Sequence, residues 1–140
     1  MRTIDRMAGA QYALITRHQL VQSGVSVHTV KRWLVEGRLQ LVHPTVYRLV
    51  GAPVSWEQRM LAAVLAAGRG VVASHRAAAR LWGLVDDDGV EITVPENRWV
   101  RLAGVRVHGS RLHGRCSETS TARTSWWRWA GPSCGSRGPT

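Results

Sequence analysis

The chain has 140 residues, 44% hydrophobic residues and a net charge of +10, which suits one domain with a substantial core. No apolar run approaches the roughly 18–20 residues of a membrane span, and the N-terminus lacks the apolar segment of a secretory signal. These features predict a cytoplasmic protein with a polyanionic partner and no membrane association. A GC-rich gene would also favour arginine over lysine, so the positions of the basic residues are more informative than their number.

A pair of helices is predicted near the N-terminus. Residues 3–10 are expected to form a short helix that closes the core of this pair. Thr16 is a suitable N-cap, because its hydroxyl can accept a hydrogen bond from a free backbone N–H of the next helix. Leu20 supplies an apolar position in that helix, and Gly24 ends it as a residue that readily adopts positive φ.

The second helix of the pair has two different faces. Ser26 caps it and Gly37 ends it, whereas Val27, Val30 and Leu34 recur at helical spacing and are predicted to face the core. The opposite face presents hydrogen-bond donors near its N-terminal half, as a recognition helix does in the major groove of DNA. These donors are His28, Thr29, Lys31 and Arg32.

A hairpin is predicted after the helices, because Leu39, Leu41 and Val46 alternate with polar neighbours around His43-Pro44. Residues 1–50 therefore predict a winged helix-turn-helix domain. The residues expected to contact DNA from the helix pair are Thr16, Arg17, Ser26, His28, Thr29, Lys31 and Arg32, and those from the hairpin are Arg38, His43 and Arg48. The alternative is that two amphipathic helices joined at a glycine also occur in folds that bind no DNA.

Residues 51–110 predict a small α/β unit. A helix begins at Ser55, which has capping-box spacing to Gln58, and its apolar residues are expected to form one stripe composed of Met60, Leu61, Val64 and Leu65. A short strand at 71–73, a helix at 75–82 and two strands joined as a hairpin, 90–94 and 104–108, complete the unit. The predicted class is α+β: a winged helix-turn-helix, a small α/β unit and an irregular tail at 111–140.

Other clusters support weaker hypotheses. Ser74, His75 and Arg76 could bind a phosphate at the start of a helix, or they could be a cap and a structural histidine beside a core of Leu81 and Trp82. Three consecutive acids at 86–88 lack the ligand spacing of an EF-hand, which favours a solvated turn. The histidines show no zinc-ligand spacing, and the two cysteines are far apart. We therefore predict no enzyme, no cofactor and no metal site.

Several motifs in order resemble one family. They are LITRHQLVQSGVSVHTVKRWLVEGRLQLVHPTVYRL, APVSWEQRMLAAVLAAG, ASHRAAARLWGL and EITVPENRWVRLAGVRVH. Together they resemble the N-terminal half of actinobacterial antitoxins of the AbiEi type, from type IV toxin–antitoxin systems. The resemblance implies an operator-binding winged helix that represses its own operon, and a nucleotidyltransferase toxin as a partner. Similar chains have a C-terminal domain like the very-short-patch-repair endonuclease.

The predicted function is a sequence-specific DNA-binding repressor or antitoxin, apparently truncated. Two alternatives stay open: the front end of an endonuclease-like protein, and a toxin-binding module without DNA specificity. Residues 111–140 lose all periodicity and contain ARTSWWRWA, where the family resemblance predicts a stretch such as ARTVVDLA. Because a one-base shift turns the tryptophan codon TGG into the valine codon GTG, we expect a frameshifted, poorly ordered tail.

Overall fold

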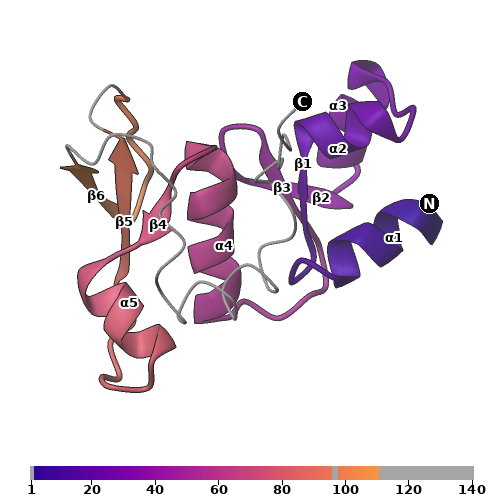
Figure 1. Cartoon of the computed structure of the whole chain (residues 1–140). Coiled ribbons are helices and arrows are strands. Elements are labelled where there is room, and N and C mark those ends of the chain that lie inside the picture. Colours follow the sequence, from indigo (N-terminus) through magenta and orange to yellow (C-terminus); the bar gives the residue numbers. More distant parts are fainter. Residues whose placement is uncertain (1, 96–97, 111–140) are drawn as a thin grey trace, which may run out of the picture.

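The computed structural model describes residues 2–95 and 98–110, which form a mixed α+β fold with two small sheets (Figure 1). The mixed α+β class predicted from the sequence is confirmed, and the predictions for 111–140 lie outside the described residues. The elements are α1 (Arg2–Gly9), β1 (Leu14–Thr16), α2 (Arg17–Gln22), α3 (Val27–Val35), β2 (Leu39–His43), β3 (Val46–Leu49), α4 (Trp56–Ala67), β4 (Val72–Ala73), α5 (His75–Leu81), β5 (Val90–Pro95) and β6 (Val105–Ser110).

The first sheet is antiparallel with the order β1-β3-β2. Strand β1 was not predicted; it pairs Leu14 with Arg48 and leads directly into α2. Tyr12 and Ala13 both adopt positive φ, which turns the chain from α1 into this strand. Helices α1, α2 and α3 pack on the sheet around a buried apolar cluster composed of Ile4, Ile15, Leu20, Val30, Leu39 and Tyr47.

The β2–β3 hairpin has a break in its register. The pairing shifts between Leu41 and His43, which interrupts the side-chain alternation that the sequence predicted. Leu41, which precedes the shift and pairs with Tyr47, is 56% exposed, whereas the neighbouring Val42 packs against residues of α4. The predicted hairpin is present, but Leu41 is not one of its inward-facing residues.

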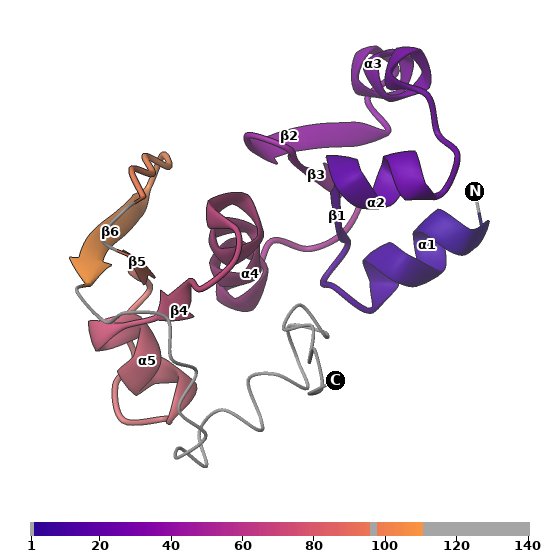
Figure 2. The ribbon, with the colours of Figure 1, turned by 45° about the horizontal axis from the view of Figure 1, so that its top comes forward.

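Helix α4 lies between the two sheets (Figures 1 and 2). Its Leu61 packs with Leu14 and Val46 of the first sheet, whereas its Met60 belongs to the cluster around the second sheet. The predicted single apolar stripe is therefore wrong, because α4 has buried residues on two sides. Ser55 caps α4 as predicted, but the Gln58 side chain donates to the carbonyl of Tyr12, at 2.6 Å, and so ties α4 to the first sheet.

The second sheet has the order β4-β5-β6, and β5 and β6 are parallel. The predicted hairpin between them is wrong. Arg98, in the connection, donates to the carbonyls of Ala67 (2.7 Å) and Arg69 (3.0 Å), which holds this segment beside the end of α4. The chain can thus return to the start of β5 before β6 begins, as a parallel pairing requires.

Helix α5 covers this sheet with small side chains. Its buried residue is Ala77, and the predicted core residues Leu81 and Trp82 are 43% and 58% exposed. The core prediction for these two residues is therefore wrong. Seven residues make only about two turns, so α5 has few positions that can face the sheet.

Candidate nucleic-acid interface

The local sequence fixes the position of α3. Gly24 adopts a φ of +80°, which allows the tight connection from α2, and the Ser26 hydroxyl accepts the backbone N–H of Thr29 at 3.2 Å. On the inner side, Val30 is buried and Trp33 and Leu34 pack on the same cluster. These contacts orient the remaining face of α3 away from the core.

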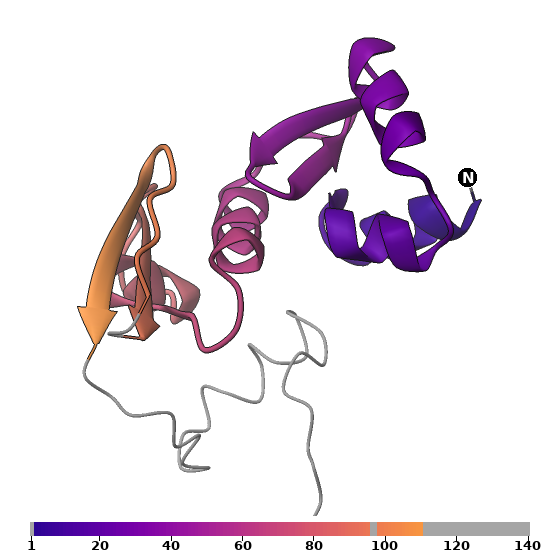
Figure 3. The same cartoon turned by 90° about the horizontal axis from the view of Figure 1, so that it is seen from above.

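The outer face of α3 is exposed and contains His28, Lys31, Arg32 and Val35, which we call the α3 face. These residues follow one another at helical spacing, and α3 lies at the end of the molecule opposite β6 (Figure 3). Val35 is 89% exposed and was missed by sequence reasoning, although its position in the stripe could have revealed it. Val27, predicted to face the core, is 44% exposed, which corrects that prediction.

The hydroxyl groups predicted to contact DNA also form hydrogen bonds within the protein. Thr16 and Gln19 form a complete capping box at the start of α2. Ser26 and Thr29 share a hydroxyl–hydroxyl hydrogen bond of 3.0 Å, and Thr29 is half-buried. These residues therefore orient the two helices first, and Ser26 is the more accessible of the pair.

Arg17 and Arg38 are exposed basic residues, Arg17 at the start of α2 and Arg38 three residues after the end of α3. The backbone N–H of Arg17 donates to the carbonyl of Thr45 at 2.8 Å, so the start of α2 adjoins the hairpin turn. Arg48 is half-buried and its guanidinium donates to Gln40 across the hairpin. Arg38 is thus freer than Arg48 to reach an external anion.

His43 does not fit the predicted phosphate contact. Its side chain is 8% exposed, and burial lowers its pKa below the ordinary value of 6.5. A buried ring with a lowered pKa is a poor partner for phosphate, because it neither reaches the anion nor favours the cationic form. The register shift between Leu41 and His43 pairs His43 with Val46, on the face of the sheet that packs against α4.

Glu36 is an acidic residue that pairs with Arg32 and Arg38 and would compete with DNA phosphates for them. Its carboxylate lies 3.6 Å from Arg32 and 3.3 Å from Arg38, and all three side chains are more than 40% exposed. Exposed ion pairs of this kind contribute little to stability, so an incoming phosphate can replace Glu36 as the counter-ion of both arginines.

Among the residues that the structure describes, the excess of basic over acidic side chains lies mostly in the first part of the chain. Residues 1–50 have seven basic and two acidic side chains, whereas residues 51–110 have seven basic and six acidic ones. Within the described residues, the net charge that attracts a polyanion is therefore largest around the first sheet and its helices.

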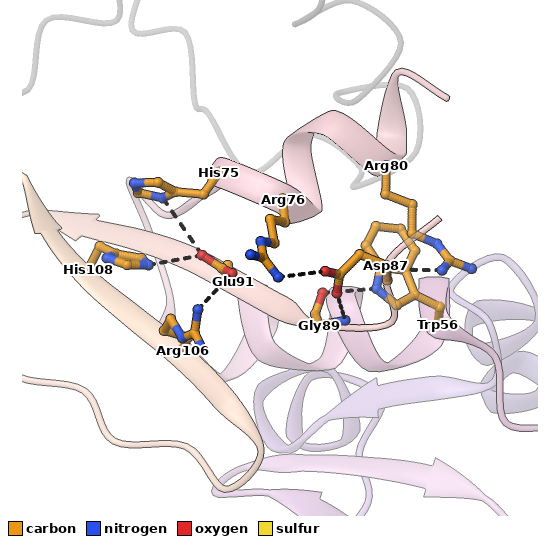
Figure 4. A network of polar contacts seen from close by, with 9 residues as sticks. All are labelled: Trp56, His75, Arg76, Arg80, Asp87, Gly89, Glu91, Arg106 and His108. Carbon is orange, nitrogen blue, oxygen red and sulfur yellow. Dashed lines mark hydrogen bonds and ion pairs between the residues drawn. The ribbon is translucent and has the colours of Figure 1, made fainter. Parts of the chain in front are cut away.

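The positive charges of Arg76 and Arg80 on helix α5 are instead paired with the acidic residues 86–88. Arg76 pairs with Asp87 at 3.1 Å, and Arg80 pairs with Asp86 and Asp88 at 3.1 and 2.8 Å (Figure 4). The backbone N–H of Gly89 and then Arg76 hold the pKa of Asp87 below its ordinary value. These contacts disfavour both the phosphate site at Arg76 and a free cation site at the acids. The side chains of Asp86 and Asp88 are 100% and 79% exposed, so the acidic segment is solvated as predicted, although it also pairs with α5.

One group of possible metal ligands was missed by sequence reasoning. His75, Glu91 and His108 bring three donor atoms to within 4.8 Å of one another. Their positions in the sequence are widely separated, and they meet because α5, β5 and β6 are neighbours in the fold. Only the parallel β5–β6 pairing places His108 beside the start of α5, so a search for local ligand spacing could not find the group.

No protein-family model and no curated protein matches the chain. The similarity to AbiEi-type antitoxins stays a prediction from the sequence motifs. In the described part of the chain, no helix is both long and apolar enough to cross a membrane.

Proposed function

We propose that residues 1–50 form a winged helix-turn-helix domain that binds double-stranded DNA in a sequence-specific manner. In this proposal α3 is the recognition helix and the β2–β3 hairpin is the wing. The observation that supports it best is the α3 face, an exposed stripe of donors on a helix whose opposite side is anchored in the core. The net positive charge of the same fifty positions, seven basic against two acidic side chains, supports it independently.

The chemistry of the α3 face suits base recognition. The major groove admits an α-helix, and Arg32 and Lys31 offer donors for the N7 and O6 acceptors of guanine. His28, one turn away, is a further donor, and the exposed Val35 could contact a thymine methyl group. Arg17 and Arg38 flank these residues and would fix the register by binding phosphates.

The biological role that we infer is autoregulation. The order of motifs resembles AbiEi-type antitoxins, which implies that the operator lies in the promoter of the chain's own operon. The same resemblance implies a nucleotidyltransferase toxin as a protein partner. Both inferences depend on that resemblance, whereas the DNA-binding proposal also has the support of the α3 face.

A selection from random-sequence duplexes tests the proposal. The full chain should enrich one sequence motif over several rounds, and an Arg32→Ala variant should lose the preference at one position of that motif. A matched Arg69→Ala variant, which removes an exposed arginine of the α4–β4 connection, should enrich the same motif as the unchanged chain. Enrichment of no motif by the unchanged chain would refute sequence-specific binding.

A further inference from the structure

The cluster composed of His75, Glu91 and His108, which we call the His-Glu-His cluster, lies outside the α3 face and has no part in the proposed DNA binding. His75 begins α5, Glu91 lies on β5 and His108 lies on β6 (Figure 4). His108 Nε2 is 3.1 Å from Glu91 Oε2, and His75 Nδ1 is 3.9 Å from the same oxygen. One carboxylate oxygen therefore faces two imidazole nitrogens from two other elements.

We propose that this cluster binds one divalent transition-metal ion, with Zn²⁺ as the best fit. Zinc binds histidine nitrogen and carboxylate oxygen at about 2.0–2.2 Å, so donors around a tetrahedral ion are about 3.3 Å apart. The two measured separations, 3.1 and 3.9 Å, bracket that value. Imidazole nitrogens with one carboxylate suit zinc, iron, nickel or copper, whereas calcium and magnesium prefer oxygen ligands alone.

The carboxylate is held in place for such a role. Glu91 is 5% exposed, and its other oxygen, Oε1, lies 3.3 Å from the guanidinium of Arg106. This contact orients the carboxylate so that Oε2 points to the two rings, as outer-shell partners orient ligands in metal sites. The rings themselves are 4.1 Å apart at an interplanar angle of 34°.

The backbone at His75 supplies an independent observation. His75 has a φ of +51°, in the left-handed region that residues other than glycine rarely adopt. Such conformations concentrate at sites where a side chain must be held in one direction. Ser74, which should cap α5, makes no side-chain hydrogen bond to the helix, so capping does not explain the strained backbone. The strain instead places the His75 ring beside Glu91 and His108.

The cluster is open on one side. The side chains of His75 and His108 are 57% and 33% exposed, whereas that of Glu91 is 6% exposed. An ion can therefore enter from solvent, and a fourth position would be available to water, as in three-ligand zinc sites. Because the ligands come from α5, β5 and β6, bound metal would fasten the helix to both parallel strands.

Isothermal titration of the full chain with ZnCl₂ tests the proposal. The titration uses a Cys116→Ser, Cys134→Ser background, since free thiols also bind zinc. We expect one ion per chain. His75→Ala, His108→Ala and Glu91→Gln should each weaken binding by more than the roughly 10–100-fold that loss of an outer-shell partner costs. The control His18→Ala removes an exposed histidine of α2 and should leave the affinity unchanged.

Arg106→Gln separates metal binding from a purely structural cluster. A structural role predicts only a loss of stability, whereas loss of the partner that orients the Glu91 carboxylate should also weaken zinc binding, by roughly 10–100-fold. Thermal unfolding without metal identifies any variant that fails to fold. Because His75 is exposed, His75→Ala is expected to fold, and its zinc affinity then tests the proposal. Visible absorption of the Co²⁺-loaded chain should show the intense bands of four-coordinate cobalt, and these should be lost in His75→Ala. Absence of stoichiometric zinc binding, or equal affinity in His75→Ala and the control, would overturn the proposal.

Discussion

Replacement of Glu36 by Gln should strengthen DNA binding, because Glu36 neutralises two arginines of the proposed interface. Its pairs with Arg32 and Arg38 are exposed, and such pairs contribute about 0.2–1 kcal/mol each. DNA must replace both, so the substitution should improve the binding free energy by about 0.4–2 kcal/mol, or about 2- to 30-fold in Kd. The fold should be little affected, because Glu36 is at the C-cap of α3, where a negative charge is unfavourable.

Fluorescence anisotropy of a labelled duplex at fixed salt measures this effect. The control is Glu57→Gln, which makes the same change of net charge on α4, away from the α3 face. A Kd for Glu36→Gln that equals or exceeds that of the control would refute the reasoning, since the arginines would then not contact phosphate.

The other predictions concern the β2–β3 hairpin, helix α4 between the two sheets, and the buried His43. Arg38→Ala should flatten the slope of log K against log[salt] by about 0.9. Arg48→Ala should flatten it by less, because the Arg48 guanidinium donates to Gln40. Anisotropy titrations over a range of salt concentrations measure both slopes. Leu61→Ala should lower the free energy of unfolding by about 2–5 kcal/mol in urea denaturation, whereas the exposed Leu84→Ala should change it by at most about 0.5 kcal/mol. The pKa of His43 is lower in the folded than in the unfolded chain, so the unfolded chain binds its proton first as pH falls. The free energy of unfolding should therefore fall below pH 6.5, and His43→Gln should lose this part of the pH dependence, measured by denaturation at several pH values.

Local signals predicted the helices and three of their caps, whereas the predicted cap Ser74 makes no side-chain hydrogen bond to α5. Thr16, Ser26 and Ser55 each accept the backbone N–H of the residue three positions later, as the sequence indicated. Such caps depend on residues within one turn of the chain, so their signals are contained in the sequence. The donors of the α3 face were found for the same reason, because helical spacing alone placed Lys31 and Arg32 together.

Features that depend on distant partners were missed. The two-sided burial of α4 requires both sheets, and the parallel pairing of β6 depends on the loop that Arg98 holds against the end of α4. Strict alternation would place His43 on the same face as Leu39 and Leu41, but the register shift in β2 places it on the opposite face, beside Val46. The His-Glu-His cluster depends on the same parallel pairing, so neither its members nor their proximity could be deduced from spacing.

The measurement that tests the central claim most directly is the affinity of a Lys31→Ala, Arg32→Ala double variant for duplex DNA. The control is an Arg69→Ala, Arg101→Ala double variant, which removes two exposed positive charges outside residues 1–50. If α3 is the recognition helix, the first variant should bind the selected duplex at least about 30-fold more weakly than the unchanged chain, since each base-reading contact contributes about 1–3 kcal/mol. The control should lose several-fold less. Equal loss of affinity in the two variants would contradict the claim that α3 reads DNA.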